Sequence, residues 1–362
     1  MSRRPILIMA GGTGGHVFPG LAVADCLRAR GETVCWLGTA NGLEARLVPA
    51  AGIEFHTLPV SGLRGKGATA WLLAPWRLGV ALWAALGLML RLKPRAVLGL
   101  GGFASGPGGL MAAALGHPLV IHEQNAIAGM TNRWLAGRAD LVLEAFPGTF
   151  PAGRQAVAVG NPVRESIRAL PEPEVRLAGR EGPLRLLVVG GSLGALALNT
   201  RVPEAVARLP EVRRPLIRHQ AGERTLDEAR RSYARAGVEA EVTAFIDDMA
   251  EAYDWADLVI CRAGALTVSE LAAAGVAALL VPYPHAVDDH QRANARHLSE
   301  AGAARLVLQD ELDPEALATW LESLDRPRLL EMARQARSLA RPDATHRVAE
   351  ACLALAGKGD CS

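Results

Sequence analysis

Each half of the chain opens with the same pattern: an apolar run, then a cluster of glycines, then a stretch with helical character. The first copy is Ile-Leu-Ile-Met-Ala-Gly-Gly-Thr-Gly-Gly-His at residues 6–16, and the second is Leu-Leu-Val-Val-Gly-Gly-Ser-Leu-Gly-Ala at residues 186–195. A buried strand that turns through glycines into a helix is typical of an α/β unit with a parallel sheet. The repetition predicts two such domains in tandem, because 362 residues are more than one core usually serves.

Short apolar runs alternate with helical stretches along the rest of the chain. This alternation predicts parallel strands joined by crossover helices. Turn residues gather between residues 160 and 183, and they favour a hinge near 161–164. The strands are expected at residues 6–10, 33–37, 96–99, 119–121 and 141–143 in the first half, and at 186–189, 216–218, 241–244, 258–261, 278–281 and 305–307 in the second.

Composition excludes several classes of protein. Half of the residues are apolar and 21% are charged, which excludes a disordered chain. Positive residues number 39 against 37 negative ones, and only 4% are aromatic, so the chain lacks the charge and the stacking side chains of a nucleic-acid-binding protein. The five scattered cysteines have no C-x-x-C spacing, which predicts reduced thiols and neither disulfides nor a zinc site.

One apolar stretch, at residues 68–92, carries Trp71, Trp76 and Trp83. Its uncharged run at 78–90 is bounded by Arg77 and Arg91, and it is shorter than the roughly 20 apolar residues that a membrane span needs. The stretch is therefore expected to form either a core helix or a helix that lies on a membrane surface.

Three glycine clusters, at residues 11–15, 101–109 and 190–194, lie between a predicted strand and a predicted helix. Such loops let backbone N–H groups at a helix start bind phosphate, although a tight turn alone would also need glycine. Three clusters favour phosphate or diphosphate binding. A dinucleotide fingerprint is absent because Val17 stands where its third glycine is required, and Gly65-Lys66-Gly67 does not fit an ATP-binding P-loop.

Candidate catalytic side chains follow two of the strands in the first half. His16 comes directly after the first glycine cluster, where it could act as a base, bind diphosphate, or simply cap or pack the helix. Ile-His-Glu-Gln-Asn at residues 121–125 ends another strand. Glu123 is a second candidate base and Asn125 could bind sugar hydroxyls, with an ordinary polar loop as the alternative.

In the second half, residues 261–270 leave a strand and start a helix after Gly264. Backbone N–H groups from Ala265 to Thr267 could hold a diphosphate and Glu270 could accept hydrogen bonds from a ribose diol, unless this is only a capped helix. Histidine and aspartate at residues 285–291 are metal-ligand types, but they sit at a helix entry where aspartate is favoured as a cap. No metal site is expected there.

Taken together, these motifs resemble the MurG family, the undecaprenyl-diphospho-muramoylpentapeptide N-acetylglucosaminyltransferases of bacterial peptidoglycan synthesis. The matching segments cover nearly the whole chain in order: residues 11–20, 101–109, 122–125, 160–164, 245–248 and 264–270. The resemblance implies a GT-B glycosyltransferase of family 28, α/β in class, with two Rossmann-like domains, parallel sheets and an interdomain cleft. It implies an acceptor-binding, membrane-associating domain at residues 1–161, joined by a C-terminal helix at 342–362, and a UDP-GlcNAc-binding domain at 162–341.

The implied reaction transfers GlcNAc from UDP-GlcNAc to the C4 hydroxyl of MurNAc in lipid I, with inversion, and yields lipid II. It needs a base, for which His16 is the first choice and Glu123 the second, and it implies neither cofactor nor metal. The implied partners are UDP-GlcNAc, lipid I, anionic lipids of the inner leaflet and other cell-wall synthesis proteins. A peripheral enzyme at the cytoplasmic face of the bacterial inner membrane would serve cell-wall biogenesis, and through it cell shape, division and the cell cycle.

Family roles are implied at matching positions. Ile246 would meet the uracil through its backbone, Glu270 would bind the ribose, and Gln291 would contact the GlcNAc with Asn125 and Ala265. Arg164 and Ser192 would lie by the nucleotide phosphates, and the loop at residues 102–106 would face the acceptor. The implied substrate-binding residues are Thr13, Gly14, Gly15, Asn125, Arg164, Ser192, Ile246, Ala265, Leu266, Thr267, Val268, Ser269, Glu270 and Gln291.

The resemblance also gives the apolar stretch a role, which is docking on the membrane; packing against the sheet is the alternative. The residues implied are Leu72, Leu73, Trp76, Leu78 and Trp83, with Arg64, Lys66, Arg77 and Arg91 nearby.

The chain departs from the family pattern at three positions: Phe103 replaces a tyrosine, Ala263 replaces a serine, and His290 replaces a glutamine in a segment one residue longer. Two other functions stay open from the sequence. One is a UDP-GlcNAc 2-epimerase or another GT-B transferase, and the other is a non-catalytic protein that binds a nucleotide sugar and recruits cell-wall proteins.

Overall fold

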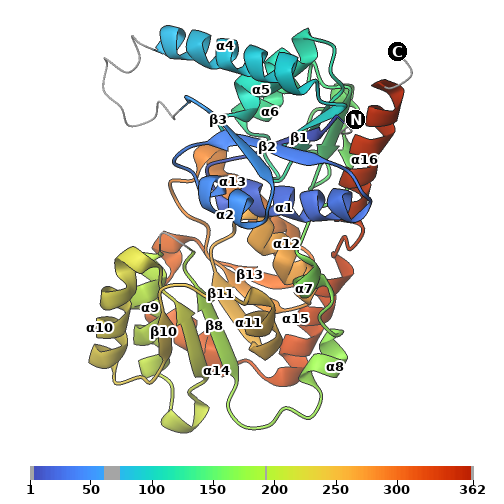
Figure 1. Cartoon of the computed structure of the whole chain (residues 1–362). Helices are drawn as coiled ribbons and strands as arrows, with labels where there is room; N and C mark the ends of the chain where they lie inside the picture. The colour runs from blue at the N-terminus through green and yellow to red at the C-terminus, as the bar shows by residue number, and fades with distance from the viewer. Residues whose placement is uncertain (1–3, 61–73, 192–193, 360–362) are drawn as a thin grey trace. The chain divides into compact units, whose positions relative to one another are not determined.

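The structure, a computed structural model, describes residues 4–60, 74–191 and 194–359 (Figure 1). The chain divides into two compact units, Met1–Arg164 with Arg341–Ser362, and Glu165–Ala340. The sequence-based division at 161/162 and 341/342 differs from this by 3 residues at the first boundary and by 1 at the second. Each unit contains one parallel sheet with its own helices, so the expected pair of α/β domains is confirmed.

The first unit is built on a seven-stranded sheet of order β3-β2-β1-β4-β5-β6-β7. Its strands are β1 Ile6–Met9, β2 Val34–Thr39, β3 Glu54–Leu58, β4 Ala96–Gly99, β5 Leu119–Glu123, β6 Leu141–Glu144 and β7 Val157–Ala158. Its helices are α1 Gly14–Ala29, α2 Glu44–Ala50, α4 Ala74–Leu92, α5 Ser105–Ala114, α6 Met130–Leu135, the 3-10 turn η1 Ala152–Arg154, and α16 Ala344–Gly359.

Successive side chains of β1 point to opposite faces of the sheet and so belong to two separate core clusters of this unit. Ile6 and Ile8 pack with residues of α1 and α16, whereas Leu7 and Met9 pack with residues of α4 and α5. A parallel sheet needs apolar side chains on both faces because helices cover both. The fully apolar sequence of β1 follows from that requirement.

The second unit is built on a six-stranded sheet of order β10-β9-β8-β11-β12-β13. Its strands are β8 Arg185–Val189, β9 Leu216–Gln220, β10 Glu241–Thr243, β11 Leu258–Cys261, β12 Ala277–Leu280 and β13 Ala304–Leu306. Its α-helices are α7 Glu165–Arg168, α8 Pro173–Leu177, α9 Leu196–Ala207, α10 Leu226–Ala236, α11 Met249–Trp255, α12 Ala265–Ala274, α13 His290–Ser299, α14 Pro314–Glu322 and α15 Arg326–Ser338. Its 3-10 turns are η2 Glu211–Arg213, η3 Glu223–Thr225, η4 Val287–Asp289 and η5 Gln309–Glu311.

Both sheets reverse their strand order at one point, between β1 and β4 in the first unit and between β8 and β11 in the second. Doubly wound sheets bind ligands outside the carboxyl ends of the strands at this reversal. The glycine clusters at residues 11–15, 101–109 and 190–194 follow β1, β4 and β8, so all three lie at a reversal point.

The eleven predicted strands are all present, each within two residues at either end. Two strands were missed. β3 carries Glu54, His56 and Thr57 among its five residues, and β7 has only two residues, both exposed. Neither contains the apolar run on which the prediction depended.

Helix α4 buries one face in the core and exposes another. Ala81, Ala85 and Met89 are buried in the core, while Trp76 and Trp83 are 73% and 77% exposed. Trp71, Arg64, Lys66, Leu72 and Leu73 lie outside the described residues. Among the helices that the structure describes, none combines the length and the hydrophobicity needed to cross a membrane.

Candidate active site

Two glycine loops meet at the reversal point of the first sheet. Gly102 has a φ of +87°, and a Cβ built there would lie 2.5 Å from the carbonyl oxygen of Gly11. Only glycine allows this backbone contact. The hydroxyl of Ser105 lies 2.8 Å from the carbonyl oxygen of Met9 and 2.7 Å from that of Gly101, which ties the second loop to the end of β1.

A buried carboxylate, that of Glu44, accepts a hydrogen bond from the first loop. The sequence analysis did not identify this residue. Glu44 Oε2 accepts a hydrogen bond from the N–H of Gly12 at 3.0 Å, and Oε1 accepts from the N–H and the hydroxyl of Thr39 at 2.9 and 2.7 Å. Burial alone would raise the pKa of this carboxyl, but the hydrogen bonds from Thr39, from the Glu44 backbone and from Gly12 together outweigh it and hold the pKa below its ordinary value. Glu44 therefore supports the loop as a carboxylate.

Helix α1 begins directly after this loop. Thr13 is the extended N-cap residue, and Gly14 and Gly15 supply the first turn, which contains no acidic residue. Backbone N–H groups and the positive end of the helix dipole at such a start attract phosphate. Thr13, Gly14 and Gly15 thus stand where an anionic group of a substrate would be stabilised.

His16 is half-buried in the first turn of α1, and its ring packs over the second glycine loop. A Cβ at Gly101 would lie 3.1 Å from Cε1 of the His16 ring, so a side chain there would crowd the imidazole. Nδ1 of His16 lies 2.8 Å from Oε1 of Gln124, which follows β5. The imidazole is therefore oriented from two sides.

Gln124 is bonded in turn to His122, a buried residue of β5. Gln124 Nε2 lies 3.0 Å from His122 Nδ1 and donates to the His122 carbonyl oxygen at 3.0 Å. His122 Nε2 lies 2.9 Å from the carbonyl oxygen of Gly160. Burial lowers the pKa of His122 to about 4, despite the opposing effects of Gly160 and Glu123.

Glu123, the second candidate base, has its carboxylate enclosed. Oε1 accepts from the backbone N–H and the side-chain amide of Asn125 at 3.0 and 3.1 Å. Oε2 accepts from the N–H of Gly129 at 3.0 Å and from the amide of Asn132 at 2.9 Å. The carboxylate is buried, and four donors fix the loop that carries Asn125.

In the second unit, α12 begins after Gly264, and Ala265, Leu266 and Thr267 form its first turn. Val268 and Leu266 have buried side chains, so these residues offer backbone groups rather than side chains. The hydroxyl of Ser269 donates back to the carbonyl oxygen of Ala265 at 3.0 Å. This helix start resembles that of α1 because its first turn also contains no acidic residue.

Glu270 lies in the second turn of α12 and is buried. The hydroxyl of Tyr253, on α11, donates to Glu270 Oε2 at 3.2 Å. Tyr253 is a further residue that the sequence analysis did not identify, because no local motif links it to Glu270. Ser192 lies outside the described residues. Gly191 and Gly194, which lie on either side of residues 192–193, have φ values of +81° and +79°.

The remaining predicted residues lie on loops or beside them. Ile246 is half-buried between β10 and α11. Gln291, on α13, accepts from the N–H of Tyr283 through Oε1 at 2.9 Å. Arg164 belongs to the first unit, where its guanidinium carbon lies 5.1 Å from the ring centre of Phe18.

The segment before α13, which contains residues of metal-ligand type, forms the turn η4. Asp288 and Asp289 both have a φ of +53°, a left-handed conformation that aspartate tolerates better than most residues. No group of three or more histidine, cysteine, aspartate or glutamate side chains is arranged to hold a metal within residues 4–60, 74–191 and 194–359.

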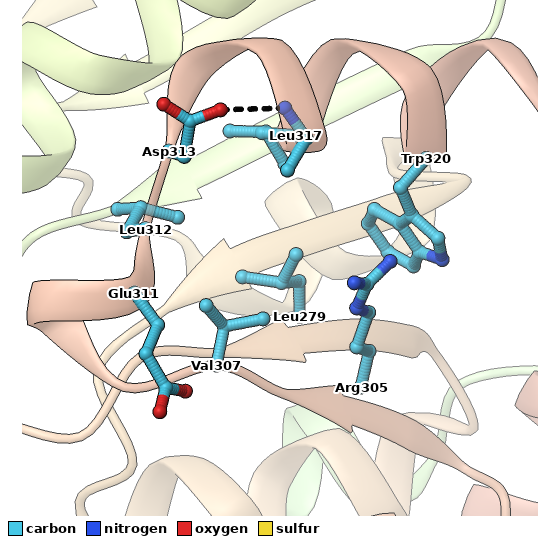
Figure 2. Close-up of a pocket in the computed structure, with 9 residues that line it drawn as sticks. Leu279, Arg305, Val307, Glu311, Leu312, Asp313, Leu317 and Trp320 are labelled. Atoms are coloured by element: carbon cyan, nitrogen blue, oxygen red, sulfur yellow. Dashed lines mark hydrogen bonds between the residues drawn. The ribbon is translucent and has the colours of Figure 1, made fainter.

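The second unit also contains a small cavity beside α14 (Figure 2). Leu279, Leu312 and Leu317 line it, and the Arg305 guanidinium carbon lies 5.4 Å from the ring centre of Trp320 at one side. Its volume of about 20 Å³ holds roughly one water molecule, far less than the roughly 300 Å³ at the lower end for ligand sites. None of the predicted site residues lines this cavity.

Comparisons with known proteins agree with the motifs. The profile of the glycosyltransferase family 28 N-terminal domain matches residues 6–144, and that of the family 28 C-terminal domain matches residues 185–348. A protein of Marinobacter nauticus is 58% identical over 98% of both chains. A protein of Alkalilimnicola ehrlichii is 60% identical over 96% of this chain and 98% of its own. Both are named UDP-N-acetylglucosamine--N-acetylmuramyl-(pentapeptide) pyrophosphoryl-undecaprenol N-acetylglucosamine transferase.

Solved structures give the same result. MurG of Acinetobacter baumannii superposes with a TM-score of 0.84 at 44% identity, over 97% of this chain and 100% of that one. UDP-GlcNAc 2-epimerase of Neisseria meningitidis has a TM-score of 0.65 at 12% identity, and this likeness shows the fold alone. The predicted resemblance and the GT-B fold class are confirmed. The chain therefore belongs to glycosyltransferase family 28, in the branch formed by these N-acetylglucosaminyltransferases.

Proposed function

We propose that the chain transfers GlcNAc from UDP-GlcNAc to the C4 hydroxyl of MurNAc in lipid I, with inversion, and so forms lipid II. Its closely similar relatives are named for this transfer to an undecaprenol-linked acceptor. The observation that carries the proposal in the structure is the position of His16. Its half-buried imidazole lies at a helix start between two glycine loops, with Nδ1 engaged by Gln124.

Inversion in one step requires a base for the acceptor. The C4 oxygen attacks the anomeric carbon, its proton passes to His16, and the bond from the anomeric carbon to the UDP oxygen breaks with its electron pair on UDP. A positioned base contributes roughly 10²- to 10⁴-fold to such a rate. His16 is favoured over Glu123 because four donors already occupy the Glu123 carboxylate.

The first unit is proposed to bind the acceptor. Thr13, Gly14 and Gly15 would hold the lipid diphosphate through backbone N–H groups, together with the loop at residues 102–106. Asn125 would contact the transferred sugar. Glu123 would then act as the residue that fixes Asn125, because its Oε1 accepts both the N–H and the amide of that residue.

The second unit is proposed to bind UDP-GlcNAc. The start of α12, at Ala265 to Ser269, would stabilise the charge that develops on the departing diphosphate, a task that a helix N-terminus performs without a metal. Glu270, held by the Tyr253 hydroxyl, would accept hydrogen bonds from the ribose. The further donor-site residues proposed are Ser192, Ile246 and Gln291 of this unit, and Arg164, which belongs to the first.

The enzyme is further proposed to act as a peripheral protein on the cytoplasmic face of the inner membrane, with anionic lipids and other cell-wall synthesis proteins as partners. Trp76 and Trp83 support this, since both are exposed on α4, the helix that also carries Arg77 and Arg91. Tryptophan and arginine together favour the interface of an anionic bilayer.

The proposal is tested by turnover of a lipid I analogue with UDP-GlcNAc, repeated with UDP-GalNAc. Formation of the disaccharide product with a strong preference for UDP-GlcNAc is expected. Free ManNAc or UDP-ManNAc formed from UDP-GlcNAc alone would instead identify an epimerase. Binding of UDP-GlcNAc without any product would identify a non-catalytic protein.

A further inference from the structure

We infer that Gln124 sets the tautomer of His16, and that His122 fixes the orientation of Gln124, so that His16 Nε2 is the atom that takes the proton from the acceptor. This inference rests on the function proposed above and deepens it. It assigns the buried residues His122 and Gln124 of the first unit a role as positioning residues.

The hydrogen-bond chain starts at the backbone of Gly160. Its carbonyl oxygen can only accept, so the nitrogen 2.9 Å away, Nε2 of His122, must carry a hydrogen. Burial keeps the pKa of His122 near 4, so its ring is neutral at physiological pH and Nδ1 has no hydrogen. His122 Nδ1 is therefore an acceptor.

This acceptor fixes the side-chain amide of Gln124. Gln124 Nε2 lies 3.0 Å from His122 Nδ1 and 3.0 Å from the His122 carbonyl oxygen. Both neighbours accept, so the amide nitrogen must face them; the reversed amide would place Oε1 against two acceptors and lose both hydrogen bonds. The amide oxygen must then point towards His16.

The amide oxygen in turn fixes His16. Oε1 of Gln124 lies 2.8 Å from His16 Nδ1 and can only accept, so Nδ1 carries the hydrogen. A neutral imidazole has one N–H, and Nε2 is left with its lone pair for the acceptor hydroxyl. When Nε2 takes the proton, the Nδ1 hydrogen bond persists unchanged.

The arrangement is also rigid. The backbone carbonyl oxygen of Gln124 accepts from the side-chain amide of Asn161 at 3.0 Å, and His122 and Gln124 are both buried. Every link between His16 and Gly160 joins neutral groups, so the tautomer is set by hydrogen-bond direction rather than by a neighbouring charge.

The tautomer is measured directly in protein labelled with ¹⁵N at its histidine rings, by long-range ¹H–¹⁵N spectra at pH 8. His16→Asn identifies the His16 signals among the nine histidines. We expect the wild-type His16 to show a protonated Nδ1 and a bare Nε2. In Gln124→Met, which keeps the side-chain length but not the amide, the signals should move towards the Nε2–H form.

Turnover gives the second readout. Gln124→Met should lower kcat by about 10- to 100-fold, the range found for residues that orient the ligands of metal sites, while KM for UDP-GlcNAc stays within about twofold. Asn161→Ala is the matched control, because it removes a buried amide bonded to the Gln124 backbone without touching the Gln124 amide. It should lower thermal stability but leave the His16 tautomer as in the wild type.

A bare Nδ1 on wild-type His16, or an unchanged tautomer in Gln124→Met, would overturn the inference even if the enzyme turns over lipid I. The expected spectra in a protein that does not turn over lipid I would instead refute the proposed function and leave the tautomer assignment intact.

Discussion

Glu44 and Gly12, 32 residues apart, are joined by a hydrogen bond of 3.0 Å from the backbone N–H of Gly12 to Oε2 of Glu44. The bond connects the start of α2 to the first glycine loop, so the loop conformation depends on a buried carboxylate outside every recognised motif.

Glu44→Gln should lower the free energy of unfolding by about 1–3 kcal/mol at pH 7, because an amide NH₂ group would face a backbone N–H donor. The folded-state pKa of Glu44 lies below its ordinary value, so its contribution is present above the unfolded-state pKa and is lost as pH falls through the folded-state pKa. Urea unfolding at pH 7, 5, 4 and 3 should show the difference from wild type shrinking at the acid end. Glu350→Gln, at an exposed carboxylate of α16, is the control and should change stability by less than about 0.5 kcal/mol.

Gly102→Ala should destabilise the protein by about 2 kcal/mol or more, because the new Cβ would lie 2.5 Å from the Gly11 oxygen in addition to the strain of a φ of +87°. Gly116→Ala separates the two effects, since Gly116 has a φ of +72° and open space around its Cβ position. Its cost should be about 1 kcal/mol. Equal losses in the two variants by chemical denaturation would show that the contact between the loops is unimportant.

His16→Ala should lower kcat by about 10²- to 10⁴-fold and leave UDP binding intact, since it removes the proposed base. Glu123→Gln should act mainly on stability, by about 1–3 kcal/mol, because two of its four donors would face an NH₂ group. In both variants, calorimetry measures the binding of UDP and steady-state kinetics measure kcat. A larger loss of kcat in a stably folded Glu123→Gln than in His16→Ala would assign the base to Glu123.

His219, buried on β9, should make the second unit sensitive to acid. Burial lowers the pKa of His219 to about 3, whereas the unfolded-state pKa is about 6.5. Between these two values the unfolded state binds more protons, so the free energy of unfolding decreases as the pH is lowered. His219→Gln should be less stable at pH 7 but should lose up to about 1.4 kcal/mol less per pH unit between pH 6 and 4. Tyr233→Phe is the control: it removes the hydroxyl 3.0 Å from His219 Nδ1 but keeps the titrating ring, so its pH slope should match that of the wild type.

The double substitution Trp76→Ser with Trp83→Ser should weaken sedimentation with phosphatidylglycerol-containing vesicles by about tenfold or more, because each exposed indole would bury apolar area in the bilayer interface. Thermal stability should stay unchanged, since the side chains are 73% and 77% exposed. Val175→Ser with Val212→Ser, at residues of the second unit that are 69% and 88% exposed, should leave vesicle binding intact. Unaltered vesicle binding by the tryptophan variant would place the membrane contact elsewhere.

The strands and the glycine loops could be predicted because each depends on neighbours in sequence. The buried run of β1 and the glycines after it are a local pattern, and the order of strands then follows from the doubly wound topology. Strand β3 was missed since its Glu54 and His56 interrupt the apolar pattern.

The contacts that orient the site could not be predicted. His16 and Gln124 are 108 residues apart, and no spacing rule joins them. For Glu123, the sequence predicted a carboxylate at the end of a strand. It did not predict that donors of Asn125, Gly129 and Asn132 surround that carboxylate. Tyr253 and Glu44 were missed because both act through contacts with residues of other elements.

Helix α16 has a consequence for synthesis of the chain. Val348, Ala349 and Cys352 belong to the same buried layer as Ile6 and Ile8, and α16 packs beside α1 (Figure 1). A nascent chain leaving the ribosome therefore produces the whole second unit before it supplies the helix that completes the first. The unit that is translated first is the one whose core is completed last, so His16, the proposed base, lies in a unit that is fully packed only after α16 has been translated.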